Sequence, residues 1–235
     1  MVVYAANLIS VVLFSAMADK YKYRSPINAE QDKRLPVMVF TVLVIISFQI
    51  VAGFRYDVGT DYVNYMLIYT EIFNKGIGGA TGEKIEIGFA ILCKILAFFT
   101  YKPFVMFFIT SLFINVLIIL ELRRHSSCFW MACLMFILTS EFLTTLNIVR
   151  QAIAMAILFS ANRFLIDRKF ISYCVCAVLA SLFHLSALIL IPVYFVVDKP
   201  AWSKLTWIMV ACTAVVYVLF STVMSGLLSA SSATR

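Results

Sequence analysis

The chain alternates between long apolar blocks and short polar stretches. Apolar blocks cover residues 37–54, 104–120 and 205–228, and each is close to the roughly 20 residues that a helix needs to cross about 30 Å of hydrocarbon. Residues 39–46 do not alternate between apolar and polar positions, which argues against the strands of a membrane β-barrel. The pattern predicts an all-α, polytopic transmembrane bundle of about seven to nine membrane helices, forming a single transmembrane domain over residues 1–235.

Basic residues in the polar stretches predict how the bundle is oriented. Residues 19–35 are rich in Lys and Arg, so the positive-inside rule makes this segment a cytoplasmic loop and leaves the N-terminus outside. Basic residues also follow the spans predicted over 103–122 and 147–166. With both of those ends in the cytoplasm, the longest polar stretch, 54–85, becomes an outer-face loop, and the turn at 144–147 faces the same side.

The remaining apolar segments are shorter or less regular. Residues 86–100 number about fifteen and contain Lys94, so we expect a re-entrant segment rather than a full crossing. Residues 127–146 are predicted to form one span, and residues 170–198 a pair of short spans with an outer turn at 181–184. A last span covers 205–228.

Composition narrows the class of protein. Apolar residues make up 63% of the chain and charged residues 13%, which excludes an ordinary soluble domain. The net charge is +7, but the basic residues lie in short loops between the spans. Such a distribution indicates the orientation of the protein in the membrane, so we expect no nucleic-acid partner. The six cysteines all fall in apolar stretches, without the spacing or histidines of a zinc site. We therefore expect no metal and no cofactor.

Ionisable side chains at membrane depth are costly, so each is a candidate for function. The first group lies where the second span leaves the membrane and consists of Arg55, Asp57 and Asp61, among glycines and aromatic residues. In a functional interpretation Arg55 binds an anionic headgroup, and Asp57 or Asp61 accepts a proton from a hydroxyl. The alternative is an aromatic belt at the membrane interface with a local Arg–Asp pair.

A second group of polar residues opens a helix on the same side. Asn147, Arg150 and Gln151 precede the small residues Ala154 and Ala161 at helical spacing, which leave a crevice or permit close helix packing. An arginine in the first turn adds its charge to the free backbone N–H groups, a combination that suits a phosphate or diphosphate. The alternative is an arginine that extends to the membrane surface, in a helix capped by Asn147.

His184 is the third candidate and Glu86 a weaker fourth. His184 is one of two histidines and the one that lies in an apolar run. It is either a catalytic base or a hydrogen-bonded structural residue. Glu86 either contributes to a binding site or pairs with a neighbouring basic residue.

Four motifs, taken in order, carry a resemblance to a known family: Gly53-x-Arg55-x-x-x-Gly59-Thr60-Asp61, Glu86-x-Gly88, Asn147-x-x-Arg150-Gln151 and Phe183-His184-x-Ser186-Ala187-Leu188. They resemble the EpsG family of bacterial membrane proteins in both order and approximate spacing. The resemblance extends from Met1, where Val3-Tyr4-Ala5-x-Asn7 is family-like, to at least residues 191–195. Members are typically longer than this chain, so we expect a C-terminal portion of the family to be missing here.

That family is similar to Wzy-type polymerases, which join polyprenyl-diphosphate-linked oligosaccharides on the outer face of the bacterial plasma membrane. The resemblance implies a multi-pass, GT-C-like membrane glycosyltransferase that makes exopolysaccharide, capsule or O-antigen, works with membrane lipids and other polysaccharide export proteins, and contributes to biofilm. Together with the residue chemistry it suggests a metal-independent reaction. The expected catalytic residues are Asp61, Asp57 and His184, and the expected substrate-binding residues are Arg55, Arg150, Gln151, Asn147 and Glu86.

Three other functions remain open at this point. A lipid-linked sugar transporter would use the same arginines to escort a headgroup, although the sequence lacks the internal symmetry common in transporters. A membrane acyltransferase centred on His184 leaves the segments at 59–61 and 147–151 unexplained. The third is a non-catalytic component of polysaccharide synthesis, which includes an inactive fragment.

Overall fold

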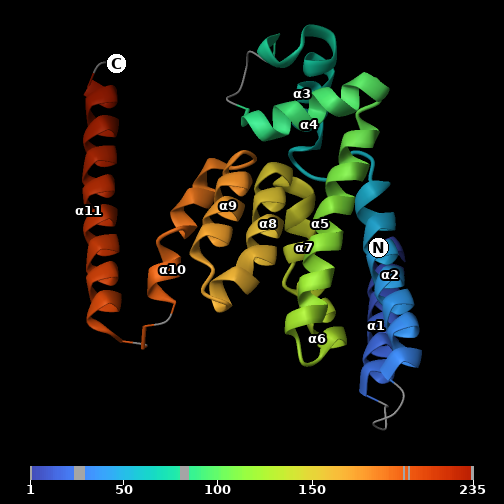
Figure 1. Cartoon of the computed structure of the whole chain (residues 1–235). Coiled ribbons are helices and arrows are strands. Elements are labelled where there is room, and N and C mark those ends of the chain that lie inside the picture. Colours follow the sequence, from blue (N-terminus) through green and yellow to red (C-terminus); the bar gives the residue numbers. More distant parts are fainter. Residues whose placement is uncertain (1, 24–29, 80–84, 198, 201, 234–235) are drawn as a thin grey trace. The chain divides into compact units, whose positions relative to one another are not determined.

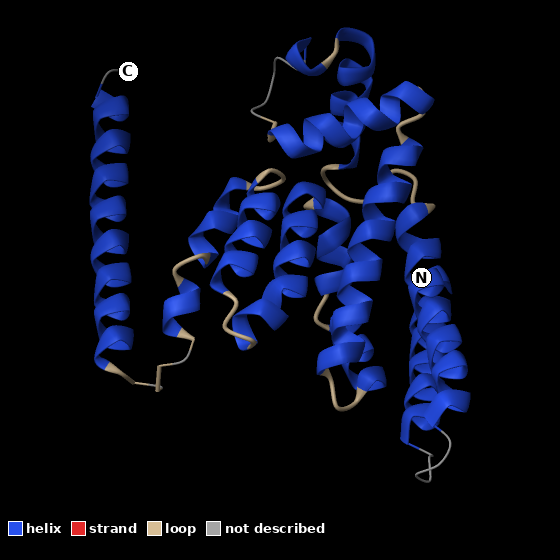
Figure 2. Cartoon of the chain, viewed as in Figure 1, coloured by secondary structure: helices blue, strands red, loops and turns tan. Residues whose placement is uncertain are grey.

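The computed structural model describes residues 2–23, 30–79, 85–197, 199–200 and 202–233, and every regular element in these ranges is helical (Figure 2). The elements are α1 (Val2–Tyr23), α2 (Glu30–Gly53), α3 (Tyr62–Lys75), the 3-10 helix η1 (Ile77–Gly79), α4 (Ile87–Phe99), α5 (Phe104–His125), α6 (Phe129–Leu138), α7 (Glu141–Asn147), α8 (Val149–Ile166), α9 (Phe170–Ser181), the 3-10 helix η2 (Leu185–Leu190), α10 (Val193–Val196) and α11 (Lys204–Ala233). The all-α prediction is confirmed for this part of the chain.

The chain forms two compact units, Met1–Leu188 and Ile189–Arg235. The first unit carries all the candidate residues of the sequence. The second contains α10 and the 30-residue helix α11, which covers the span predicted over 205–228. The single domain predicted over residues 1–235 stays a prediction.

Four helices in the described ranges are long and apolar enough to cross a membrane, namely α1, α2, α5 and α8. The pair α6 and α7 forms a fifth crossing if it is one broken span, with a bend of 55° between its halves. The chain is therefore a multi-pass membrane protein, with four or five candidate crossings by length and composition. The span predicted over 127–146 is not one unbroken helix, because Ser140 adopts a left-handed φ of 64° between α6 and α7; that the pair forms one crossing stays a prediction.

The two predicted loops are more helical than expected. In the segment 19–35, α1 continues to Tyr23 and α2 begins at Glu30, while residues 24–29 lie outside the described residues. The segment 54–85 contains η1 and the whole of α3, whose buried residues recur at helical spacing: Tyr62, Tyr65, Ile68, Tyr69 and Ile72. Polar residues between these positions obscured the helical periodicity of the apolar residues through which α3 packs onto the bundle.

Residues 86–100 and 170–198 also differ in detail from their predicted forms. The first contains α4, a 13-residue helix that packs on α3 and is too short for a full crossing; a re-entrant course stays a prediction. In the second, α9 is followed by η2 and the four-residue α10 rather than by one regular returning helix. Pro192 lies between η2 and α10, where it lacks an N–H donor and disfavours helical geometry at the preceding residue.

Helix α5 belongs to both large cores of the first unit. One core joins it to α3, α4 and α8, and the other joins it to α1, α2, α6 and α7. Gln49 of α2 hydrogen-bonds three groups of α5: its amide nitrogen donates to the Phe108 carbonyl (2.9 Å) and lies 3.1 Å from the Ser111 hydroxyl, and its oxygen accepts from Asn115 (3.1 Å) and lies 3.3 Å from the same hydroxyl. Buried polar bonds of this kind hold helices together where lipid replaces water.

The helices of the first unit begin and finish at two opposite ends, and α3 and α4 lie together at one of them (Figure 1). At one end Lys22 of α1 and Arg123 and Arg124 of α5 line a common cavity of about 410 Å³, so two of the three basic segments predicted to be cytoplasmic lie together. At the opposite end α2 finishes, α5 and α8 begin, and α3 packs against α4. The candidate residues of the sequence lie at this second end.

Candidate functional site

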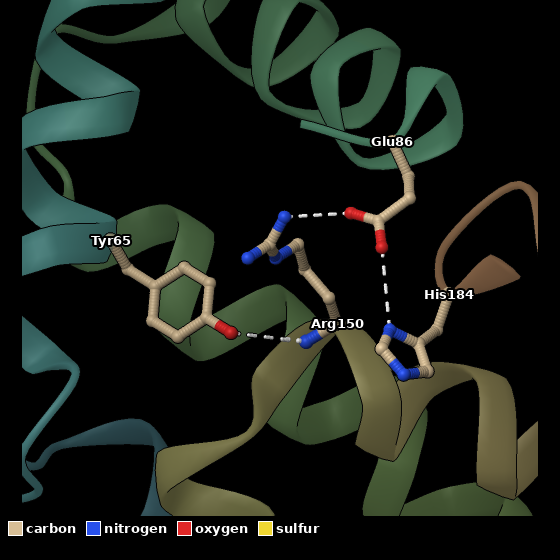
Figure 3. A network of polar contacts seen from close by, with 4 residues as sticks. All are labelled: Tyr65, Glu86, Arg150 and His184. Atoms are coloured by element: carbon tan, nitrogen blue, oxygen red, sulfur yellow. Dashed lines mark hydrogen bonds and ion pairs between the residues drawn. The ribbon is translucent and has the colours of Figure 1, made fainter. Parts of the chain in front are cut away.

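Three segments that are distant in sequence meet at Glu86, the residue that precedes α4 (Figure 3). Its Oε2 accepts a hydrogen bond from Nη1 of Arg150, in the first turn of α8, at 2.7 Å. Its Oε1 lies 3.3 Å from Nδ1 of His184, in the turn after α9. The structure therefore brings together three of the residues selected from the sequence and shows that Glu86 pairs with two basic partners at once.

Gly88 explains how the start of α4 approaches the turn after α9. Its backbone N–H donates to the Leu182 carbonyl at 2.8 Å. A Cβ atom at this position would lie 2.7 Å from that carbonyl oxygen, closer than side chains approach backbone. Only glycine fits here without displacing one of the two segments, and the two segments carry Glu86 and His184.

Tyr65 of α3 forms another wall of the same cluster. Its hydroxyl accepts the backbone N–H of Arg150 at 3.5 Å, and the guanidinium carbon of Arg150 lies 5.9 Å from the centre of its ring. Figure 3 shows the tyrosine and Glu86 on two sides of the arginine. Helix α3 thus helps to fix both the backbone and the charge of Arg150.

Asn147 connects the end of α7 to the loop after α2. Its Oδ1 accepts the backbone N–H of Thr60 at 2.9 Å, and the preceding residue, Gly59, has a φ of 104°. The amide does not cap α8, where no side-chain cap is formed, so the alternative in which Asn147 caps the helix of Arg150 is wrong. Asn147 and Gly59 also line a cavity of about 470 Å³ together with Tyr4, Asn7 and Phe142.

Arg55 is a buried cation at the same end of the unit. The residue is 6% exposed, and its guanidinium carbon lies 4.9 Å from the centre of the Phe107 ring, which stacks on Tyr62 at 4.4 Å. Its Nε has no hydrogen-bond partner among the described residues. Burial lowers the pKa of Arg55 to about 10, against the opposing effect of Tyr62 and Tyr65, so the side chain stays charged at neutral pH.

The carboxylates expected to pair with Arg55 do not do so. Asp57 is exposed with a φ of 51°, and Asp61 is half-buried just before α3. Among the described residues neither side chain forms an ion pair with Arg55, which removes the local Arg–Asp pair as an explanation of this segment. Gln151 is exposed on α8. The functional roles of Asp57, Asp61 and Gln151 stay predictions.

The EpsG family matches residues 38–233, which is most of the chain. The chain belongs to the EpsG family. The four motifs at 53–61, 86–88, 147–151 and 183–188 all fall within the matched residues, whereas the family-like residues near the N-terminus lie before them. No curated protein and no solved structure matches the chain.

Two members of the site in this EpsG-family protein were not selected from the sequence. Tyr65 lay in the predicted outer-face loop and Phe107 in a predicted membrane helix, and neither carries a charge. A helical period running through Tyr62, Tyr65 and Tyr69 was available as a signal that one face of 62–75 is buried. Within the described ranges no group of three or more His, Cys, Asp or Glu residues is arranged to hold a metal ion.

Proposed function

We propose that this EpsG-family protein is a polysaccharide polymerase, which transfers a polyprenyl-diphosphate-linked glycan to an acceptor sugar on the outer face of the bacterial plasma membrane. The observation that best supports the proposal is Arg55, a buried guanidinium with no anionic partner among the described residues. A buried charge without a counter-ion is costly, so a ligand that supplies a negative charge would compensate it.

The reaction needs two kinds of groups, and this end of the unit offers both. The departing diphosphate needs positive charge held in a low-dielectric site, which Arg55 and Arg150 would provide without a metal ion. The attacking sugar hydroxyl needs a base, for which Asp57, Asp61 and His184 are the candidates. In this proposal Glu86, Asn147 and Gln151 help to bind the substrate.

The proposal also includes further membrane crossings. Helix α11 has 30 residues and is therefore about 45 Å long, enough to span a bilayer. If α9 and the segment Leu185–Val196 cross as a short pair, the total reaches the predicted seven to nine helices of a GT-C-like bundle. The candidate site would then face outward, where other polysaccharide export proteins supply and receive the glycan.

The proposal is tested by the length of the surface polysaccharide in cells that lack this gene and carry it back as wild type, Arg55→Ala or Arg150→Ala. We expect both variants to lack long chains and to accumulate single repeat units on lipid. Arg34→Ala serves as the matched control, because Arg34 is exposed at the other end of α2. Membrane insertion is checked by the amount of protein in the membrane fraction.

Other outcomes separate the competing functions. Normal polymer from Arg150→Ala would contradict the diphosphate role of that residue. If cells that lack the gene make surface polysaccharide of unchanged length, the polymerase function is contradicted, and acyl transfer or a non-catalytic role is favoured. Accumulation of lipid-linked units on the cytoplasmic side, rather than the outer side, would indicate a transporter.

A further inference from the structure

One carboxylate links two basic residues in the candidate site. Glu86 uses Oε2 for Arg150 and Oε1 for Nδ1 of His184. A carboxylate only accepts hydrogen bonds, so this contact assigns the proton of a neutral His184 to Nδ1. The other ring nitrogen, Nε2, is then a bare acceptor; it has no partner among the described residues, and the side chain is 34% exposed.

The position of Glu86 relative to His184 is fixed by backbone as well as by side chains. Two residues after Glu86, the N–H of Gly88 donates to the carbonyl of Leu182, two residues before His184. The N–H of His184 itself donates to the Ala180 carbonyl at 3.0 Å. One backbone hydrogen bond thus links the two segments and a second one fixes the turn that carries the imidazole, which is the kind of support that a catalytic pair requires.

We infer that Glu86 is a positioning residue: it orients His184 so that Nε2 acts as the base of the transfer, and it couples that base to the cation that receives the leaving group. The inference rests on the proposed function. It distinguishes His184 from Asp57 and Asp61, which have no orienting partner of this kind among the described residues. A carboxylate that holds Nδ1–H of a histidine fixes its tautomer and stabilises the imidazolium.

In the transfer, one bond forms and one bond breaks at the anomeric carbon of the lipid-linked glycan. The oxygen of the acceptor hydroxyl forms a bond to the anomeric carbon of the lipid-linked glycan, while the bond from that carbon to the diphosphate oxygen breaks. The electron pair leaves with the diphosphate, whose charge is stabilised by Arg150. The hydroxyl proton moves to Nε2 of His184, and the resulting imidazolium keeps its Nδ1–H bond to Glu86.

The first experiment measures kcat and KM of polymerisation by purified protein in liposomes with a lipid-diphosphate-linked repeat unit as substrate. Glu86→Gln keeps the size of the side chain and removes its charge. We expect kcat to fall about 10- to 100-fold with a smaller change in KM.

Glu71→Gln is the matched control, since Glu71 lies half-exposed on α3 without a hydrogen bond or ion pair among the described residues. It should leave kcat and KM unchanged. A Glu86→Gln protein with a raised KM and an unchanged kcat would show a purely binding role and overturn the inference.

A second experiment needs no substrate. The chain has two histidines, so nitrogen-15 NMR of histidine-labelled protein gives two ring signals, and His125→Gln assigns them. We expect His184 to carry its proton on Nδ1 in the wild type and to lose that preference in Glu86→Ala. An unchanged tautomer overturns the inference at any level of activity. If the tautomer changes in Glu86→Ala but the wild-type protein makes no polymer, the inference about Glu86 stands and the proposed function is overturned instead.

Discussion

At the scale of single residues, Arg55 illustrates a conflict between stability and function. The guanidinium is buried on Phe107, and desolvation is the largest effect on its pKa. A contact between a cation and an aromatic face stabilises the cation by about 1–2 kcal/mol, which is less than the free-energy cost of an isolated buried charge. Residues of this kind are retained in proteins when a ligand needs them.

This conflict predicts opposite effects of one substitution. Arg55→Met keeps much of the apolar contact and removes the charge, so we expect a melting temperature equal to that of the wild type or higher by about 2–4 °C. Polymer synthesis should fall about 100-fold, as when one stabilising group is removed from an anion site. Thermal unfolding in detergent and the liposome assay measure the two effects, and a clear loss of melting temperature would argue for a structural arginine.

The substitution Gly88→Ala tests the close approach of α4 to the turn after α9. The added Cβ would meet the Leu182 carbonyl oxygen at 2.7 Å, so the start of α4 has to move away from the turn that carries His184. We expect a loss of about 1–3 kcal/mol of stability and at least a 10-fold loss of polymer synthesis. Gly78→Ala is the control, because a Cβ there has open space; equal effects of the two variants would exclude the close approach as the cause.

The sequence was sufficient to select Arg55, Glu86, Arg150 and His184, because charged groups in an apolar chain are few and costly. It was not sufficient to pair them. Glu86 contacts partners 64 and 98 positions away, and such pairs depend on how helices pack rather than on local spacing. For the same reason the sequence suggested an Arg55–Asp pair, which is not formed among the described residues.

At the scale of elements, α3 was the main helix that the hydrophobic pattern did not reveal. Its segment contains enough Asn, Glu, Lys and Thr to read as an outer loop, and no apolar run of membrane length marks it. Yet its buried tyrosines contact the site, and the hydroxyl of Tyr69 donates to the Thr100 carbonyl at 2.7 Å. The long spans were predictable because the bilayer imposes a length; an amphipathic helix that rests on the bundle has no such constraint.

The polar link between α2 and α5 gives a prediction at this scale. Gln49→Leu would remove the hydrogen bonds to three groups of α5 and leave the buried Ser111 and Asn115 side chains with fewer partners. We expect a loss of about 1–2 kcal/mol, measured by thermal unfolding in detergent. Ile50→Leu, at a neighbouring exposed position, should change nothing. If Gln49→Leu were as stable as the wild type, the helices would be held by apolar packing alone.

At the scale of the whole molecule, the basic cavity and the candidate site lie at opposite ends of the first unit. The positive-inside rule then predicts labelling by a membrane-impermeant maleimide in intact cells. In a background without the six cysteines, Lys75→Cys should react from outside, and Arg34→Cys only after lysis. Both positions are exposed, which makes them a matched pair. The reverse pattern would turn the site toward the cytoplasm and remove the outer-face polymerase.

The contact between Asn147 and the loop of Gly59 has an evolutionary consequence. The two residues are 88 positions apart, yet a Cβ at position 59 would lie 2.4 Å from the Asn147 amide oxygen. The residue at position 59 therefore restricts which substitutions are tolerated at position 147, and the reverse also holds. Across related chains, departures from glycine at position 59 should coincide with a shorter side chain at position 147, so that the pair is inherited as one unit.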